Sequence, residues 1–506
     1  MKKIFLALLL FSSLTRAAIY VSPDGSDLNP GTLEKPLKTI PKAVIKAAGG
    51  DTIFLRAGIH ELTANVTIGD TKSGTEIKRS CLWGYPGERP LIDCSKEALG
   101  SRAFTLKASW WHFRDFDLKG AGDNGLQITS VTGAYNLIEN CTFFECRDSG
   151  IQLSAGAHHN RIINCDSYHN ADPPDYGDAD GFAPKLDVGS DNYFYGCRAW
   201  GNCDDGWDGY MRGATNVTTI LENCWTWGNG WLKDGSDPGS QANGNGFKMG
   251  GGDNSNRDML MHHFILTHCL AFNCKAKGFD QNNNVGSMTL YNCTGYGNGT
   301  ANYRITKPLA AGQTLTVKNC LSFNGGAELG SFAVQEANSW LAPFVVTAAD
   351  FVGVDYALAA APRKADGSLP DIPFMHLALG SDLIDGGVGL GLPFLGAAPD
   401  LGAFESDYRS MVTSLEAAPE GFRLEQNYPN PFNPATTIAY ALPQPERVSL
   451  RIYNLQGQEV ASLVEGWHPA GEHRVVWRPQ GLAAGIYIAR LQAGIFNATR
   501  RLVLAK

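Results

Sequence analysis

The chain has little charge and no excess of basic residues. Only 18% of its 506 residues are Asp, Glu, Lys or Arg, and the formal net charge is −8. Proteins that bind nucleic acid through its phosphates present basic patches, so this balance argues against a general nucleic-acid binder. An acidic polymer would gain no long-range attraction either, so a cation at the site would have to hold it.

Long apolar runs are also absent, apart from one at the N-terminus. Lys2 and Lys3 precede an apolar stretch that ends at Phe11, and Ala17 offers a cleavage site. The stretch is too short to cross a bilayer, and its layout is that of a secretory signal. We therefore predict a signal peptide over residues 1–17 and export of the rest of the chain.

Glycine, with 58 residues, and cysteine, with twelve, are present in a regular pattern. Seven cysteines are each followed three residues later by an aromatic residue, and an asparagine precedes most of them. These cysteines are Cys141, Cys165, Cys197, Cys224, Cys269, Cys293 and Cys320. The shortest spacing is 24 residues, and a period of this size indicates a solenoid.

The short segments of each unit alternate apolar and polar residues, which favours strands over helices. We predict a parallel β-helix in which each turn buries one cysteine and one aromatic residue, and asparagines form ladders at the bends. The cysteines then serve as small buried apolar residues. A disulfide among the remaining ones stays open: Cys81, Cys94, Cys146, Cys203 and Cys274.

A second set of equivalent positions follows each cysteine. In most units a glycine or asparagine lies nine residues after the cysteine, or further where residues are inserted, and it marks the start of the next predicted strand. Insertions at about 171–178 and 230–242 leave the coil at the same bend and are predicted to wall a cleft. Two residues after the glycine, the predicted outward positions are Gln152, Ala183, Asp208, Lys248, Asp280 and Arg304. Neighbouring coils lie about 4.8 Å apart, so Asp208 and Lys248 should be neighbours.

Four aspartates are predicted to meet beside that lysine: Asp180, Asp204, Asp205 and Asp208. Carboxylates this close cannot all stay ionised without a cation, and oxygen ligands suit Ca²⁺ rather than Zn²⁺. The alternative is that each Asp-Gly pair is only a turn. Lys248 could act as a general base, or it could merely pair with Asp208 on the surface.

A uronic-acid polymer is the substrate for which these groups make chemical sense. It carries a carboxylate next to a C5 hydrogen, which a lysine can remove while the glycosidic oxygen at C4 leaves. A cation bound to that carboxylate stabilises the developing charge. The reaction is β-elimination and needs no attacking water. A lysine base must be neutral, so we expect an alkaline pH optimum.

The runs Asp180-Gly181-Phe182, Asp204 to Asp208 and Asn243 to Gly251 resemble polysaccharide lyase family 9. That family contains pectate lyases with a right-handed parallel β-helix. The resemblance implies that the four aspartates bind a catalytic Ca²⁺ and that Lys248 is the base. Three further residues are possible substrate contacts: Lys185, Asp280 and Arg304.

The ends of the chain differ from the coils. We predict the β-helix over 18–406, a linker over 407–423 and a β-sandwich over 424–506. The sandwich resembles the C-terminal sorting domain of the type IX secretion system, through Asn427 to Pro434 and Leu482 to Tyr487. This implies a Gram-negative protein that is secreted or attached to the cell surface. The alternative is a carbohydrate-binding module.

The resulting prediction is a monomeric, secreted pectate lyase that cleaves α-1,4-linked galacturonan. One rival is a polygalacturonase-like hydrolase on the same β-helix, with Asp204 and Asp205 as its carboxylate pair. It gives Lys248 no role. The other rival is a non-catalytic β-helix adhesin, which has no reason to gather Asp and Lys beside inserted loops.

Overall fold

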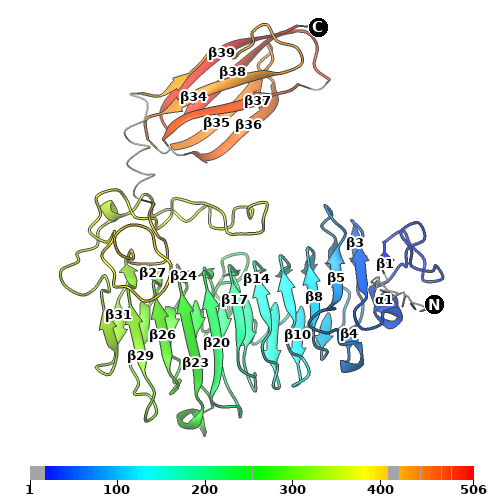
Figure 1. The fold of residues 1–506 in the computed structure, drawn as a ribbon, viewed down its shortest axis with the longest axis vertical. Coiled ribbons are helices and arrows are strands. Elements are labelled where there is room, and N and C mark those ends of the chain that lie inside the picture. The colour runs from blue at the N-terminus through cyan, green and yellow to red at the C-terminus, as the bar shows by residue number, and fades with distance from the viewer. Residues whose placement is uncertain are drawn as a thin grey trace, which may run out of the picture.

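The computed structural model describes residues 18–253, 255–407, 421–444, 446–468, 470–479 and 481–505 (Figure 1). The predicted signal peptide and residues 408–420 of the predicted linker lie outside these ranges. Within them, no helix has the length and apolar character needed to cross a membrane.

Residues 18–336 form a right-handed parallel β-helix. The repeat predicts the parallel β-helix, and the family resemblance implies its handedness. Each complete coil contributes one strand to each of three parallel sheets, here named A, B and C, and one further strand extends sheet A at each of its two ends. Sheet A contains β1 (Ala18–Val21), β2 (Thr52–Leu55), β5 (Ser80–Gly84), β8 (Trp111–Arg114), β11 (Leu137–Glu139), β14 (Arg161–Ile163), β17 (Asn192–Tyr195), β20 (Val217–Glu222), β23 (His262–Thr267), β26 (Met288–Tyr291), β29 (Leu315–Lys318) and β32 (Val334–Glu336).

The other two sheets follow the same order along the axis of the β-helix. Sheet B contains β3 (Ile59–Glu61), β6 (Leu91–Asp93), β9 (Asp117–Lys119), β12 (Thr142–Phe144), β15 (Asp166–Tyr168), β18 (Arg198–Trp200), β21 (Trp225–Trp227), β24 (Leu270–Phe272), β27 (Thr294–Tyr296) and β30 (Leu321–Phe323). Sheet C contains β4 (Val66–Ile68), β7 (Phe104–Leu106), β10 (Leu126–Thr129), β13 (Ile151–Ser154), β16 (Phe182–Pro184), β19 (Trp207–Asp208), β22 (Phe247–Lys248), β25 (Lys277–Asp280), β28 (Ala301–Ile305) and β31 (Ala327–Leu329).

The cysteine column lies inside the coils, as predicted. All twelve cysteines are buried, and no disulfide joins any of the described residues. The bend from sheet B to sheet C holds the predicted asparagine ladder, in which Asn170 donates to Asn202 at 2.9 Å and Asn202 donates to Asn229 at 3.1 Å. Each amide thereby satisfies a polar group that would otherwise be buried without a partner.

The aromatic column differs from the prediction, because its rings lie on the outer side of sheet B. Along a strand side chains alternate, so a buried Ser167 in β15 leaves Tyr168 pointing outward. The ring of Tyr168 stacks on Trp200 at 4.3 Å, and Trp200 stacks on Trp227 at 4.8 Å. Part of this column is then covered by apolar residues from 344–404, such as Phe374.

An ion cluster fastens that covering segment to the coils. Asp166 of β15 accepts from Arg198 of β18 at 2.7 Å and from Arg363 at 2.6 Å. Arg198 also donates to the carbonyl of Ala359 at 2.9 Å. The three charged side chains are at most 11% exposed, so their pairing replaces water almost completely.

Short helices cover the first coil and the loops. Helix α1 (Ile40–Lys46) starts at Thr39, whose hydroxyl accepts from the backbone of Lys42, and it buries Ile40 and Val44 over the end of the core. The helix thus caps the first coil of the β-helix. The 3₁₀ helices are η1 (Asp70–Lys72), η2 (Arg257–Met259) and η3 (Ala348–Asp350).

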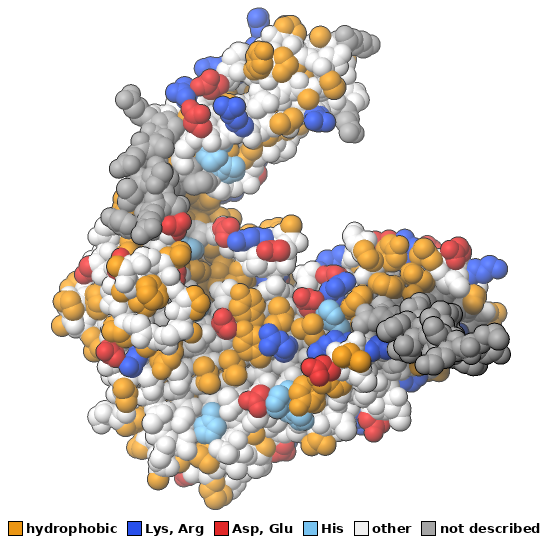
Figure 2. Space-filling view, viewed as in Figure 1, with side chains coloured by type: hydrophobic (Ala, Val, Ile, Leu, Met, Phe, Trp, Pro, Cys, Tyr) orange, Lys and Arg blue, Asp and Glu red, His pale blue; other side chains and the backbone are white. Residues whose placement is uncertain are grey.

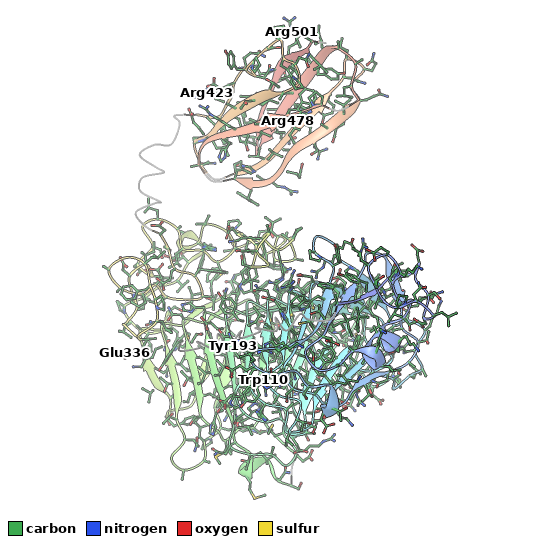
Figure 3. The ribbon with its side chains drawn as sticks, turned by 45° about the vertical axis from the view of Figure 1, so that its right-hand side comes forward. Trp110, Tyr193, Glu336, Arg423, Arg478 and Arg501 are labelled. Atoms are coloured by element: carbon green, nitrogen blue, oxygen red, sulfur yellow. The ribbon has the colours of Figure 1, made fainter. Side chains whose placement is uncertain are left out.

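The C-terminal part is an antiparallel β-sandwich with its own core, as predicted. One sheet has the order β33-β34-β37 and the other β36-β35-β38-β39. Its strands are β33 (Arg423–Leu424), β34 (Thr436–Leu442), β35 (Glu446–Tyr453), β36 (Glu459–His468), β37 (Gly471–Trp477), β38 (Gly485–Ala493) and β39 (Phe496–Leu504). Figure 3 labels Arg423 in its first strand and Glu336 at the end of β32. The sandwich therefore begins one residue inside the predicted linker.

Replacing Asp166 by Ala should destabilise the β-helix by about 3–5 kcal/mol, because two buried guanidinium groups would lose their counter-charge. The free energy of unfolding, measured by urea denaturation, tests this. Glu61→Ala is the matched control, since it removes a pair with Lys96 in which both side chains are more than half exposed. Equal losses in the two variants would contradict a stabilising role for the cluster.

Candidate active site

Three neighbouring strands of sheet C position the central residues. Asp208 of β19 is in register with Lys248 of β22, as the repeat predicts. The preceding residues point inward and are fully buried, and Trp207 stacks on Phe182 at 4.7 Å and packs against Phe247 at 5.0 Å. This aromatic packing fixes the strands, so that Asp208 and Lys248 point outward side by side.

The bend before these strands brings the aspartates together. One carboxylate oxygen from each of Asp180, Asp204 and Asp205 lies within 4.8 Å of the others, and all three residues are buried. Ser149 donates from its hydroxyl to Asp180 at 3.1 Å, and Asn245 donates from its backbone to Asp205 at 2.7 Å. These bonds fix the carboxylates in place.

Two lysines complete the cluster. The Lys248 ammonium lies 3.0 Å from Asp205 and 3.3 Å from Asp208. The Lys185 ammonium lies 2.8 Å from Asp180 and 3.6 Å from Asp208. Both lysine side chains are less than 10% exposed, so neither is a solvated surface charge.

Burial and the opposite charges nearby shift the pKa values of these groups in opposite directions. Burial raises the pKa of Asp180 well above its usual value, against the pull of Lys185. Burial alone would also raise the pKa of Asp208, but Lys248 and Lys185 outweigh it and the pKa falls. Burial alone would lower the pKa of Lys248, but Asp205 and Asp208 outweigh it and the pKa lies well above its usual value.

The donor set fits a hard cation. Four carboxylates face only two ammonium groups, so full ionisation leaves two negative charges uncompensated in a buried site. The four aspartates offer only carboxylate oxygens as metal ligands, and such ligands suit Ca²⁺ or Mg²⁺ rather than a metal that prefers nitrogen or sulfur.

Two other residues on the predicted outward stripe lie outside the cluster. Asp280 is in register with Lys248, but its carboxylate pairs with Lys277 at 3.2 Å. Arg304 is in register with Asp280 and pairs with Glu328 at 3.5 Å, where both side chains are 45% exposed. The sequence pattern therefore places Asp280 and Arg304 correctly on the stripe. It does not predict their ion pairs, because the pattern does not identify the partners Lys277 and Glu328.

The inserted segments leave the β-helix where predicted, between sheets B and C. In the first, Asp172 accepts from the backbone of Asp178 at 3.1 Å and so closes a compact loop. Lys185 donates to the carbonyl of Asp178 at 3.0 Å, which joins this loop to the cluster. In the second, the backbone of Asn243 donates to Asp204. Both insertions thus border the acidic cluster.

His262 is a supporting residue that the sequence pattern does not reveal. It lies in β23 of sheet A, where its Nδ1 lies 2.9 Å from the carbonyl oxygen of Gly209 and its Nε2 lies 2.8 Å from the hydroxyl of Thr219. A carbonyl only accepts, so Nδ1 carries the proton and Nε2 accepts from Thr219. His262 therefore holds the backbone next to Asp208 from across the coil.

Comparison with known proteins places this arrangement in a class. Residues 19–319 match the family model "Pel9A-like, right handed beta helix region". Pectate lyase L of Dickeya chrysanthemi is 35% identical over 401 residues, which cover 77% of this chain and 91% of that protein. Pectate lyase L of Paenibacillus polymyxa is 36% identical and covers 74% of this chain and 85% of that protein.

Solved structures agree. The crystal structure of pectate lyase Pel9A has a TM-score of 0.69 and 32% identity, covering 77% of this chain and 96% of that one. A rhamnogalacturonan lyase has a TM-score of 0.61 and 26% identity, covering 72% of this chain and 98% of that one. Fold and site together define a parallel β-helix enzyme of the polysaccharide lyase type. The chain belongs to the Pel9A-like family, which confirms the resemblance to polysaccharide lyase family 9.

The C-terminal sandwich has a separate match. Residues 426–505 match the model of a secretion system C-terminal sorting domain, as their motifs indicate. The match covers nearly all of the sandwich and none of the β-helix.

His262 should make the stability of the fold depend on pH. Burial lowers its pKa to about 4 from the usual value of 6.5. The unfolded chain therefore binds a proton between these values that the folded chain does not, and folding weakens as pH falls through this window. Between pH 7 and pH 4.5 the wild type should lose about 2 kcal/mol more than His262→Gln, measured by urea denaturation at both pH values. An equal fall in the free energy of unfolding of the wild type and of His262→Gln would contradict this prediction. His159→Gln is the control: it changes an exposed histidine and should show the same fall as the wild type.

Proposed function

We propose that this lyase cleaves α-1,4-linked galacturonan by β-elimination. The observation that carries the proposal is the Lys248 ammonium held 3.0 Å from Asp205 among buried carboxylates, on the outward side of sheet C. The relatives named pectate lyase support the substrate class. A hydrolase on this fold would need a carboxylate pair and water, and it would leave Lys248 without a role.

A Ca²⁺ ion would be held by four aspartates, whose carboxylate oxygens are the kind of ligand that this ion prefers. They are Asp180, Asp204, Asp205 and Asp208. When bound, the ion would offset carboxylate charge and withdraw electron density from a uronate carboxylate. The face drawn in Figure 2 carries acidic and basic side chains interspersed rather than a field of one sign. The net charge of −8 likewise provides no long-range attraction for a polyanion, so local contacts at the cluster have to capture it.

Lys248 would perform the chemical step. Its neutral amine takes the C5 proton of the uronate, the C5–H electron pair forms the C4–C5 double bond, and the C4–O bond breaks to release the chain. Burial acts to lower the pKa of Lys248, but Asp205 and Asp208 outweigh it and raise the pKa, so the carboxylates by themselves favour the ammonium form. A Ca²⁺ ion beside Lys248 would act in the opposite direction and favour the free amine at alkaline pH. Lys185, Asp280 and Arg304 are proposed as substrate contacts around this step.

The sorting domain implies export. We infer that it directs the chain through the type IX secretion system, and that the enzyme is secreted or attached to the surface of a Gram-negative cell. The catalytic unit is proposed to act as a monomer, because the cluster is built entirely from one chain.

Removing divalent cations should abolish activity on polygalacturonate, and added Ca²⁺ should restore it. The measurement is the ultraviolet absorbance of the unsaturated product, which β-elimination makes and hydrolysis does not. New reducing ends without that absorbance would identify a hydrolase. Full activity in excess chelator would remove the metal from the proposal.

Lys248→Ala should lower kcat by about 10²-fold to 10⁴-fold, the usual contribution of a positioned general base. Binding of polygalacturonate, measured by calorimetry, should persist. Lys277→Ala is the matched control, since it removes a neighbouring lysine that pairs with Asp280 outside the cluster. A Lys248→Ala enzyme within tenfold of wild-type kcat would show that another group is the base.

A further inference from the structure

Two rows of outward side chains lead away from the cluster along sheet C. Strand register aligns Thr105 of β7 with Gln127 of β10 and Gln152 of β13, and the row continues through Ala183 to Asp208. Each step is one strand spacing, so β7 lies about 24 Å from β22 at five steps of about 4.8 Å. The row is therefore long enough to lie under several sugar units.

The second row runs parallel to the first, two residues further along each strand. Thr129 is aligned with Ser154, and Ser154 lies beside Lys185 of the cluster. The amide of Gln127 is partly exposed, lines the cavity described below and makes no hydrogen bond to any other described residue, so its donors and acceptor are available. Gln152 makes none either, but its side chain is buried. Hydroxyl and amide groups in such a row suit the hydroxyl groups of a polysaccharide.

A cavity of about 570 Å³ lies at the N-terminal end of both rows. Its lining is polar or glycine throughout, and it is formed by Asn65, Thr67, Gly100, Ser101, Arg102, Thr105, Lys107, Gln127 and Thr129. An apolar ligand would find little to contact there. The two cationic side chains in the lining are the only charges on it.

Both cations keep groups that no described residue binds. Lys107 is exposed and forms no ion pair with any described residue. Arg102 pairs through its Nε with Asp123 at 3.4 Å and donates from the same atom to Asn124 at 3.3 Å, while its terminal amino groups donate to no described residue. A guanidinium with free terminal groups binds a carboxylate through two parallel hydrogen bonds.

The opposite direction along sheet C has different chemistry. Beyond Lys248 the row continues through Asp280, Arg304 and Glu328, and Arg304 already pairs with Glu328. On that side Asp280 pairs with Lys277 and Glu328 pairs with Arg304, so the charges are balanced. On the other side Lys107 has no ion-pair partner among the described residues and would attract a uronate carboxylate. The charge pattern therefore favours extension of a bound chain toward β7.

We infer that Arg102 and Lys107 form a remote subsite that binds a uronate carboxylate of the same polymer chain that is cleaved at Lys248. This inference rests on the proposed function. The subsite contributes to binding and touches no reacting atom. A polymer chain can reach both places, whereas a trimer bound at Lys248 is too short to span the five strand spacings to β7.

The test compares kcat/KM on polygalacturonate with kcat/KM on trigalacturonate, both at saturating Ca²⁺. In Arg102→Ala/Lys107→Ala the polymer-to-trimer ratio should fall about tenfold, through KM for the polymer. The trimer serves as an internal reference for folding and chemistry. The control is Arg161→Ala/Lys318→Ala, which removes one arginine and one lysine from β14 and β29 of sheet A and should keep the wild-type ratio.

A wild-type ratio in the Arg102→Ala/Lys107→Ala enzyme overturns the inference, whether both rates fall together or neither changes. Failure of the proposed function would look different, because the wild type itself would then release no unsaturated product from either substrate. Raising the salt concentration should narrow the difference between wild type and variant, since salt screens exposed charges.

Discussion

The stacking of parallel strands in register is the constraint on which the rest of the structure depends. Each coil repeats at the strand spacing of about 4.8 Å, so residues at equivalent positions become neighbours whatever their separation in sequence. Asp208 and Lys248 are forty residues apart and yet pair directly. The inward rings of Phe182, Trp207 and Phe247 hold that register, because a slip of one residue would turn every side chain to the other face.

The same stacking concentrates charge that an ordinary fold would keep apart. Asp180, Asp204 and Asp205 are buried within a few ångströms of one another, and Lys185 and Lys248 offset only part of their charge. Such a cluster costs stability unless a ligand or a cation completes it. A solenoid can bear this cost because its long core is formed by other residues, and each coil is stabilised by the coils on either side of it.

A covering layer and a second domain extend the molecule beyond the solenoid. The outer aromatic column on sheet B would expose a large apolar stripe, and residues 344–404 cover part of it. Asp166, Arg198 and Arg363 fix that cover to the coils. The C-terminal sandwich has a separate core, so the match to a sorting domain and the proposed chemistry of sheet C fall on different parts of the chain.

The sequence by itself determined the solenoid, the cysteine column, the asparagine ladder and the register of Asp208 with Lys248, because a repeat pattern records which positions stack. It could not determine the face on which the aromatic column lies, since one alternating pattern fits either side of a strand until a covering segment is known. The partners of Lys185 and the support that His262 gives to Gly209 depended on the tertiary structure. Those contacts cross the coil or join different bends, and no local spacing encodes them.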